Sequence, residues 1–254
     1  MRIKGSVLVV TGGGTGIGRA VSLEAARRGA AGVVLTYSRS AAEAEATAAE
    51  AERLGTPALA VRADVADTAQ VEALAERAVE RFGRVDALVN NAATTRAVPP
   101  GDLGALTDDI WHEILDVNVV GAFRCARALE RPLREARGAI VNTSSISAFR
   151  AGGSSIAYGV SKAALQQLTR SLAAVLAPEV RVNAVAPGTV ATRWQTGLRG
   201  EEGFAEFARQ ERESIPLRAT TQPEQVANAL LAMLEMDAVT GETLIIDGGK
   251  HVKY

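Results

Sequence analysis

Short runs of consecutive apolar residues recur along the chain and alternate with longer segments in which apolar residues return every three or four positions. The short runs are typical of strands buried on both faces of a parallel sheet, and the longer segments of helices that cover those faces. The expected strands are 7–10, 32–36, 58–61, 87–90, 139–142, 180–185 and 243–246. The expected helices are one that follows a glycine-rich turn and ends at Arg28, then 41–53, 68–82, 107–135, 155–176 and 223–236.

This alternation predicts an α/β fold: a Rossmann-type, doubly wound parallel sheet of about seven strands with helices on both faces. No linker, repeat or low-complexity segment interrupts it, so residues 1–254 are expected to form a single domain. Residues 189–215 have a mixed pattern with short helical pieces and are expected to form a lid, which we call the lid segment. Ligands of such sheets bind beyond the carboxyl ends of the strands, so the residues that follow each strand are candidates for a site.

Composition narrows the class of protein. Apolar residues make up 47% of the chain, charged residues 22%, and the formal net charge is −1, which favours a soluble globular protein over a nucleic-acid-binding or disordered one. No apolar run approaches the roughly 18 residues of a membrane span, and the first residues lack the layout of a signal peptide. One cysteine and two histidines leave no basis for a metal site. A cytoplasmic location is therefore expected.

A glycine-rich turn, Thr-Gly-Gly-Gly-Thr-Gly-Ile-Gly at residues 11–18, joins the first strand to the first helix. Glycines let the backbone approach a diphosphate, and the start of a helix offers N–H donors and a positive dipole. The turn matches neither the G-x-G-x-x-G spacing nor the P-loop, because Arg19 and Ala20 follow Gly18 where a lysine and a hydroxyl would stand. A tight turn without a ligand is the alternative.

Tyr158 and Lys162 are four residues apart, so on a helix they share one face. A fixed positive charge favours the phenolate, and the lysine is therefore expected to lower the tyrosine pKa toward the range useful for proton transfer. Lysine is scarce in this chain, where arginine is the usual basic residue. A chance Tyr-x-x-x-Lys pair remains the alternative interpretation of this motif alone.

The glycine turn and the Tyr-x-x-x-Lys pair become more specific because they belong to a series of five motifs. In chain order these are the glycine turn, Asn90-Asn91-Ala92, Asn118, Ser145 with Tyr158-x-x-x-Lys162, and Pro187-Gly188. Over essentially its whole length the chain resembles the short-chain dehydrogenases/reductases, and most closely the 3-oxoacyl-carrier-protein reductases. The resemblance implies hydride transfer between a nicotinamide cofactor and a ketone or secondary alcohol. It also implies the catalytic residues Asn118, Ser145, Tyr158 and Lys162.

The resemblance gives each of these residues a role. Tyr158 would donate the proton to the carbonyl oxygen in reduction or accept it in oxidation. Lys162 would hold the nicotinamide ribose, Ser145 would stabilise charge on the substrate oxygen, and Asn118 would support a water on the proton relay. The implied cofactor contacts are Gly12, Gly14, Thr15, Gly16, Ile17, Gly18, Tyr37, Ser38, Arg39, Ser40, Asp64, Val65, Asn91, Ala92, Tyr158, Lys162, Pro187, Gly188, Val190 and Thr192.

One residue departs from the family pattern. Ala93 stands where the family has a glycine after Asn-Asn-Ala. Its methyl group could displace the loop that follows, or be harmless if the backbone there has a negative φ.

The loop after the second strand predicts which cofactor binds. No Asp or Glu occurs from Ala25 to Ala42, whereas NAD-binding sites place an acid there for the ribose 2′-hydroxyl. Arg39, flanked by two serines, could pair with a 2′-phosphate, so NADP(H) is expected over NAD(H). Thr15 occupies the place of a second basic residue in many NADP-using relatives, and Tyr37 that of the NAD-type aspartate.

Less specific features leave the substrate and partners open. Six residues are expected to give the substrate pocket an apolar lining, which favours an apolar or amphipathic substrate over a highly charged one: Ile146, Phe149, Trp194, Leu198, Phe204 and Phe207. The resemblance implies a homotetramer that packs through helices 107–135 and 155–176. A stripe of arginines is interpreted as a solvated helix face or, alternatively, a dock for an acyl carrier protein: Arg124, Arg127, Arg131, Arg134 and Arg137.

Two other functions remain open at this stage. One is an NADP(H)-binding sensor without catalysis, and the other is an NAD-dependent alcohol, polyol or steroid-type dehydrogenase. The complete catalytic set argues against the sensor.

Overall fold

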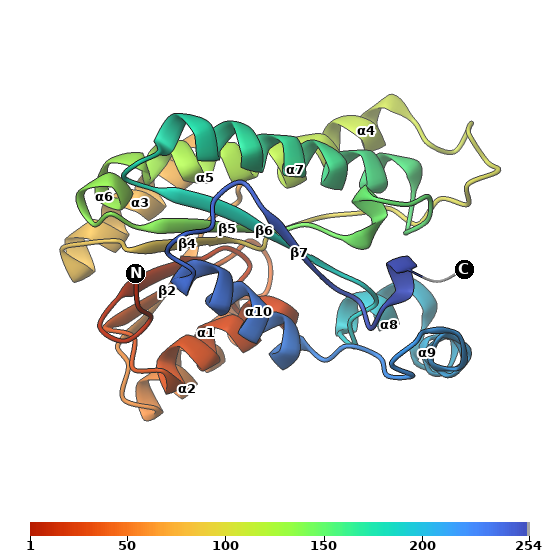
Figure 1. The fold of residues 1–254 in the computed structure, drawn as a ribbon, viewed down its shortest axis with the longest axis horizontal. Helices are drawn as coiled ribbons and strands as arrows, with labels where there is room; N and C mark the ends of the chain where they lie inside the picture. Colours follow the sequence, from red (N-terminus) through yellow and green to blue (C-terminus); the bar gives the residue numbers. More distant parts are fainter. Residues whose placement is uncertain (253–254) are drawn as a thin grey trace.

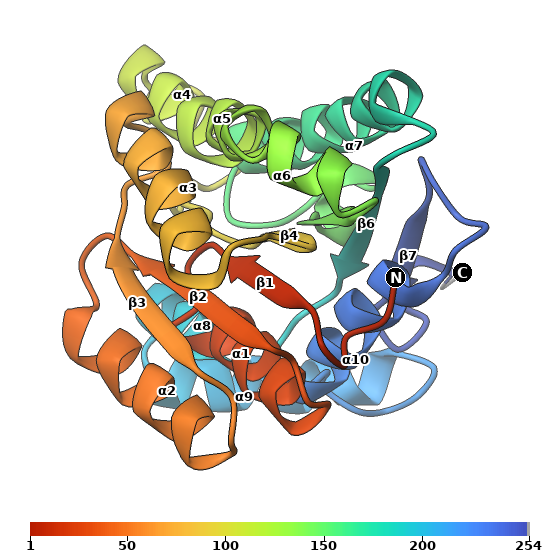
Figure 2. The same cartoon turned by 90° about the vertical axis from the view of Figure 1, so that its left-hand side faces the viewer.

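The computed structural model describes residues 1–252 of the chain, and in these residues seven parallel strands form one sheet. The strands are β1 (Val7–Val10), β2 (Gly32–Tyr37), β3 (Ala58–Arg62), β4 (Ala87–Asn90), β5 (Ala139–Thr143), β6 (Arg181–Pro187) and β7 (Thr243–Ile246). Their order in the sheet is β3-β2-β1-β4-β5-β6-β7 (Figures 1 and 2). Each lies within two residues of the range that the apolar runs predict.

Helices cover both faces of this sheet. On one face lie α1 (Gly16–Arg27), α2 (Ala41–Arg53) and α10 (Pro223–Glu235). On the other lie α3 (Thr68–Phe82), the helical segments of residues 108–135 and α7 (Ile156–Leu176) (Figure 1). Neighbouring strand residues alternate between the two layers: Val10 packs with α1 and α10, whereas Val9 packs with α3 and α7. The strands are therefore apolar on both faces, which is why they appear as continuous apolar runs.

The strand order reverses between β1 and β4. The chain crosses from β1 to β2 on one side of the sheet, and after β3 it returns to pair β4 with the other edge of β1. The two crossover directions leave a crevice at the carboxyl ends of these strands, where doubly wound sheets bind ligands. The glycine turn follows β1 and Asn91 follows β4, so both flank this point.

The predicted continuous helix over 107–135 is wrong. It consists of α4 (Asp108–Leu115), a π-helical turn (Asp116–Val120), α5 (Gly121–Ala128) and α6 (Glu130–Glu135). The break near Leu129 follows from Pro132, which has no N–H to donate to the carbonyl of Ala128. The π-helical turn carries Asn118, and such turns are often found at functional sites. The other long helix, α7 (Ile156–Leu176), is unbroken as predicted.

The lid segment contains α8 (Arg193–Arg199) and α9 (Glu201–Ser214), which lie beyond β6 at one end of the molecule (Figure 1). Buried Glu211 of α9 anchors it by accepting hydrogen bonds from Thr189, at 2.6 Å, and from the ammonium of Lys250. Lys250 begins a short 3₁₀ turn (Lys250–Val252), so the end of the described chain fastens the lid segment to the sheet. Among the helices of residues 1–252, none has the length and apolar character required to cross a bilayer.

Candidate active site

A clamp between β1 and β4 fixes the glycine turn. The hydroxyl oxygen of Thr11 accepts hydrogen bonds from the backbone N–H groups of Asn91, at 2.9 Å, and Ala92, at 3.0 Å. The side-chain amide of Asn91 donates in return to the carbonyl of Thr11, at 3.0 Å. From β2, the hydroxyl of Thr36 accepts the N–H of Gly12 at 3.1 Å. Three adjacent strands therefore hold the turn in one position.

Gly13, Gly14 and Gly18 of this turn have no space for a side chain. A Cβ on Gly14 would lie 2.7 Å from Cα of Ala44, and a Cβ on Gly18 would lie 2.1 Å from the carbonyl oxygen of Gly12. Gly12 and Gly16 have φ values of +63° and +52°, in the region that favours glycine. The backbone is thus bare where α1 begins at Gly16, with the N–H groups of its first turn free of helical partners. This cradle fits a diphosphate.

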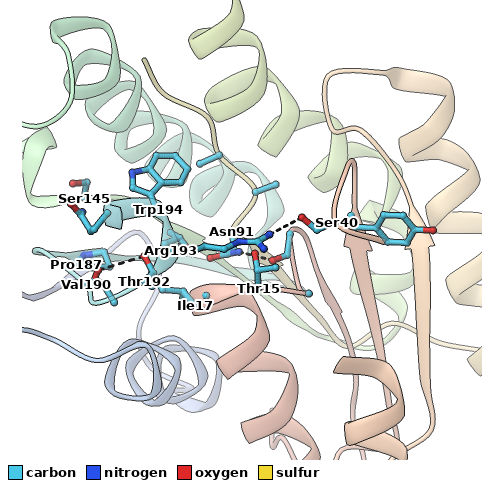
Figure 3. A pocket seen from close by; sticks show the side chains of 18 of the residues that line it. Thr15, Ile17, Ser40, Asn91, Ser145, Pro187, Val190, Thr192, Arg193 and Trp194 are labelled. Atoms are coloured by element: carbon cyan, nitrogen blue, oxygen red, sulfur yellow. Dashed lines mark hydrogen bonds between the residues drawn. The ribbon is translucent and has the colours of Figure 1, made fainter. Parts of the chain in front are cut away.

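A cavity of about 530 Å³ opens above the cradle, within the size range of small-molecule and cofactor sites (Figure 3). Most residues predicted to contact a cofactor line it, from the turn after β1, the loop after β2, the end of β4, α7 and the segment after β6. They are Gly12, Gly14, Thr15, Gly16, Ile17, Tyr37, Ser38, Arg39, Ser40, Asn91, Ala92, Tyr158, Lys162, Pro187, Gly188, Val190 and Thr192. The donors and cradle fit a nicotinamide dinucleotide.

Three of the predicted cofactor contacts do not line this cavity. Gly18 faces the carbonyl of Gly12 instead, and its role is to allow close packing of α1 against the turn. Val65 is buried against α5, and its carbonyl accepts a hydrogen bond from Arg124. Asp64 accepts the N–H of Ala66 at 3.0 Å within its own turn. The order of motifs along the chain does not give the direction in which a residue points.

The cavity also includes residues that the motifs do not mark. They are Thr36, Ala93, Thr143, Ser144, Arg193, Trp194 and Gln195. Arg193, Trp194 and Gln195 directly follow Thr192. Trp194 is among the residues expected to line the substrate pocket, and extending the predicted cofactor contact by three residues adds Arg193 and Gln195.

Tyr158 and Lys162 occupy the first turns of α7, whose start is capped by Ser155 accepting the N–H of Tyr158 at 3.2 Å. The ammonium nitrogen of Lys162 lies 5.6 Å from the centroid of the Tyr158 ring. It donates to the carbonyl of Thr143, at 2.8 Å, at the end of β5. The predicted pair is therefore present on one helix face, inside the cavity.

The expected direction of the tyrosine pKa shift is wrong for this structure. Burial raises the pKa of Tyr158 to about 12, and the Ser145 hydroxyl opposes this rise only in part. Burial also lowers the pKa of Lys162 to about 8, because its side chain is 2% exposed. Desolvation dominates the pKa of both groups, and residue spacing does not reveal how deeply a side chain is buried. At neutral pH the phenol of Tyr158 carries its proton.

Ser145 lies two residues after the end of β5 and lines the cavity. Its hydroxyl oxygen accepts the N–H of Ser147 at 3.1 Å, which caps a short 3₁₀ turn (Ile146–Ala148). The hydroxyl also lies close enough to Tyr158 to influence that residue's pKa. The two hydroxyls therefore converge, as a pair that binds one substrate oxygen requires.

Asn118 does not line the cavity. Its side-chain oxygen accepts the N–H of Thr94 at 2.8 Å, and its amide donates to the carbonyl of Thr94 and to the hydroxyl of Ser161, both at 3.0 Å. Ser161 directly precedes Lys162. Asn118 thus fixes the loop after β4 against the catalytic helix, and its side chain is fully engaged in these contacts.

The alanine that departs from the family pattern causes no backbone strain. Among non-glycine residues 1–252, only Arg137 and Arg218 have a positive φ, so Ala93 adopts an ordinary conformation. Its methyl group forms part of the cavity wall.

A second cavity of about 300 Å³ adjoins the first at Ser145 and Tyr158. Ile146, Trp194, Leu198 and Phe207 line it as predicted, whereas Phe149 and Phe204 do not. The Trp194 and Tyr158 rings lie 6.3 Å apart between centroids. Three basic residues outside the predicted lining also border this cavity: Arg150, Arg199 and Lys250. Its wall is therefore more polar than predicted.

Arg193, the first residue of α8, extends from the lid segment toward the loop after β2 (Figure 3). Its guanidinium donates to the hydroxyl of Ser40 at 2.7 Å and to a carboxylate oxygen of Glu43 at 2.5 Å. The hydrogen bond from Arg193 holds the pKa of Glu43 below its ordinary value. An arginine of the lid segment thus reaches the part of the cavity for which the sequence predicted a 2′-phosphate.

Comparison with known proteins identifies the family. A family model described as enoyl-(acyl carrier protein) reductase matches residues 12–251. A crystal structure of a Burkholderia xenovorans protein assigned to the short-chain dehydrogenases/reductases is 31% identical, with a TM-score of 0.90 over 98% of both chains. The chain belongs to the short-chain dehydrogenase/reductase family.

Two curated members of this family are also similar over nearly their whole length. A Streptomyces violaceoruber protein named as ketoacyl reductase 2 of the granaticin polyketide synthase is 43% identical, over 97% of this chain and 96% of its own. The 3-oxoacyl-[acyl-carrier-protein] reductase of Synechocystis is 35% identical, over 96% of both chains. Membership of the short-chain dehydrogenases/reductases makes this protein an oxidoreductase that uses a nicotinamide cofactor.

Proposed function

We propose that this protein is an NADP(H)-dependent reductase that converts a ketone to a secondary alcohol, with Tyr158 as the proton donor. The observation that carries the proposal is the meeting of the two cavities at Ser145 and Tyr158. One cavity contains the diphosphate cradle, and the other contains a partly apolar, partly basic wall suited to an amphipathic substrate. Catalytic hydroxyls at their junction can reach a carbonyl group placed between cofactor and lid.

The residues of the chain account for the proton chemistry. Bound in the larger cavity, between the glycine turn and Lys162, a nicotinamide dinucleotide would supply the hydride. The hydroxyls of Ser145 and Tyr158 would bind the substrate oxygen, and Ser145 would stabilise the charge that develops on it. Because burial keeps the phenol of Tyr158 protonated at neutral pH, this group carries the proton that reduction of a ketone requires.

Cofactor preference is expected to depend on Arg39. Arg39 is exposed at the cavity, and within residues 1–252 it forms no ion pair, so its guanidinium is available to a 2′-phosphate. The parent enzyme should show a kcat/KM at least about tenfold higher with NADPH than with NADH, and Arg39→Ala should reduce this ratio through the NADPH value alone. Steady-state kinetics with both cofactors measure it.

Arg53→Ala is the matched control, because Arg53 is an exposed arginine at the far end of α2 and outside the cavity. It should leave the ratio unchanged. A parent enzyme that prefers NADH, or an Arg39→Ala variant that loses both cofactors equally, contradicts the assignment of NADP(H) and of this arginine.

The substrate class we propose is a 3-oxoacyl thioester, because ketoacyl and 3-oxoacyl reductases are among the similar family members. Purified protein should be screened against 3-oxoacyl thioesters, cyclic ketones and polyols with both cofactors. Turnover of polyols with NAD⁺ alone would support the alternative, an NAD-dependent dehydrogenase, and binding without any turnover would support a sensor.

An acyl carrier protein as partner stays a prediction. Three of the five arginines in the predicted stripe already pair within the chain, Arg124 with Asp116, Arg131 with Glu135, and Arg134 with Glu130 and Glu179. The break between α5 and α6 also divides the stripe. These features favour the interpretation of a solvated face.

We also propose a homotetramer. Exposed apolar side chains gather on the π-helical turn, α5 and the outer face of α7: Val120, Phe123, Ile156, Val160 and Val175. Light scattering at micromolar concentration should give the mass of an oligomer for the parent, and Val160→Asp should lower that mass because a carboxylate would be buried without a partner. Leu103→Asp, at an exposed leucine outside these helices, should not. A monomeric parent refutes the proposal.

A further inference from the structure

Arg193 connects two parts of the cofactor cavity that are about 150 residues apart in sequence. It belongs to α8 of the lid segment, whereas Ser40 and Glu43 belong to the start of α2, directly after the loop that contains Arg39. Ser40, Arg39 and Arg193 all line the larger cavity. The guanidinium therefore lies beside the loop after β2, where the adenosine end of a dinucleotide is expected.

We propose that Arg193 is a second ligand of the 2′-phosphate of NADP(H), and that Glu43 holds its guanidinium in place until the phosphate binds. The inference rests on the NADP(H) preference proposed above. It supplies the basic residue that Thr15 does not provide in the glycine turn.

The contacts of Arg193 are those of an anion site. Its two terminal nitrogens point at one carboxylate oxygen and one hydroxyl, the arrangement in which a guanidinium binds two oxygens of a phosphate. Ser40 directly precedes α2, so the first N–H groups of that helix and its positive dipole end lie beside the same place. Glu43, in the first turn of α2, supplies the negative charge that these donors attract.

The ion pair between Arg193 and Glu43 is weak enough for a phosphate to replace Glu43 as the partner of Arg193. The two side chains are 55% and 46% exposed, and ion pairs at such exposure contribute little to stability. A phosphate carries more charge than a carboxylate and has more acceptor oxygens, so it can displace Glu43 and bind Arg193, Arg39 and Ser40 together. The loss of its partner leaves Glu43 as a like charge near the phosphate, which moderates the affinity.

This contact would couple recognition of the phosphate to the lid. Trp194 follows Arg193 and lies beside the ring of Tyr158. A phosphate that fixes Arg193 therefore also fixes the start of α8 next to the catalytic tyrosine. A cofactor without the phosphate leaves the Arg193 guanidinium with only its exposed contacts to Ser40 and Glu43, so the start of α8 is held less firmly.

Equilibrium binding tests the proposal without reference to turnover. NADPH and NADH affinities, measured by fluorescence titration, should respond differently to Arg193→Gln: a loss of about 10- to 100-fold for NADPH and less than about threefold for NADH. The NADPH affinity of Arg193→Lys should lie between those of the parent and Arg193→Gln, because lysine keeps the charge but lacks the planar pair of N–H donors of a guanidinium. Glu43→Gln should bind NADPH a few-fold more tightly and leave NADH unchanged. Arg209→Gln, an exposed arginine of α9 outside both cavities, is the control.

A second readout uses the lid segment itself. The chain has two tryptophans, so Trp111→Phe leaves Trp194 as the single reporter. In this background 2′,5′-ADP should change the Trp194 emission and slow tryptic cleavage within the lid segment, whereas 5′-ADP should do neither to the same extent. Both effects should disappear in Arg193→Gln.

The outcomes separate this inference from the proposed function. Equal losses for NADPH and NADH in Arg193→Gln would assign the residue to the diphosphate and overturn the proposal, as would an unchanged NADPH affinity. If the parent prefers NADPH through Arg39 while Arg193→Gln has no effect, the proposed function stands and only this inference fails. A parent that prefers NADH overturns both.

Discussion

Tyr158→Phe should reduce ketone reduction by about 100- to 10,000-fold while NADPH still binds with nearly the parent affinity. The substitution keeps the ring, which lies against Trp194, and removes only the hydroxyl that shares the junction of the two cavities with Ser145. Turnover with an active ketone and NADPH fluorescence titration measure the two effects separately.

A loss of turnover without a loss of NADPH binding would assign the Tyr158 hydroxyl to the chemical step. If Tyr158→Phe lost cofactor binding and turnover together, the hydroxyl would be a structural element of the cofactor site. Activity within tenfold of the parent would show that another group donates the proton. Thermal unfolding of the variant provides the control for the fold.

Lys162→Met should abolish most activity and yet stabilise the protein at pH 7 by roughly 1–3 kcal/mol. Lys162 is 2% exposed, and burial lowers its pKa from 10.5 to about 8, a shift that corresponds to about 3 kcal/mol. Methionine has a similar shape and no charge to desolvate. Part of the gain is offset because the carbonyl of Thr143 loses the hydrogen bond from Lys162.

The same shift predicts how stability depends on pH. Between about pH 8 and pH 10.5 the unfolded chain keeps a proton on Lys162 that the folded chain has released, so the parent becomes more stable as pH rises through this window. Below it both states are protonated and the penalty is constant. The advantage of Lys162→Met should therefore be largest at pH 7 and shrink toward pH 10.5, as urea unfolding at several pH values can measure.

Lys4→Met is the matched control, because Lys4 is exposed. Its stability should follow that of the parent at every pH. A Lys162→Met variant less stable than the parent at pH 7 would mean that bonds to the ammonium outweigh its desolvation.

The features that the sequence predicts best are those set by local pattern. Each strand carries its apolar run, and the turn after β1 carries its glycines, so the sheet and the cradle follow from neighbouring residues. Tyr158 and Lys162 share one face because helical spacing fixes it. The break in the predicted helix 107–135 also has a local cause, because Pro132 is visible in the sequence. The apolar periodicity continues on both sides of this proline and therefore predicts one unbroken helix.

The features that the sequence analysis missed depend on tertiary packing. Arg193 meets Glu43 only because the lid segment folds back over the cavity, and no spacing along the chain indicates that contact. The pKa of Tyr158 depends on how much water the closed fold excludes, which residue types alone do not give. Val65 and Asp64 illustrate the same limit, because their positions in sequence were known but their directions were not.

The strand order has a consequence for synthesis on the ribosome. Strands β1 to β4 form one contiguous half of the sheet, and β5, β6 and β7 each add to the edge left by the strand before. The chain can therefore assemble the nucleotide cradle first and the reacting residues later. The face of α1 that packs on α10, however, waits for residues 223–235. At about 5–20 residues per second, synthesis from the end of α1 at Arg27 to the end of α10 at Glu235 takes roughly 10–40 s, during which an apolar surface stays open to aggregation and to chaperones.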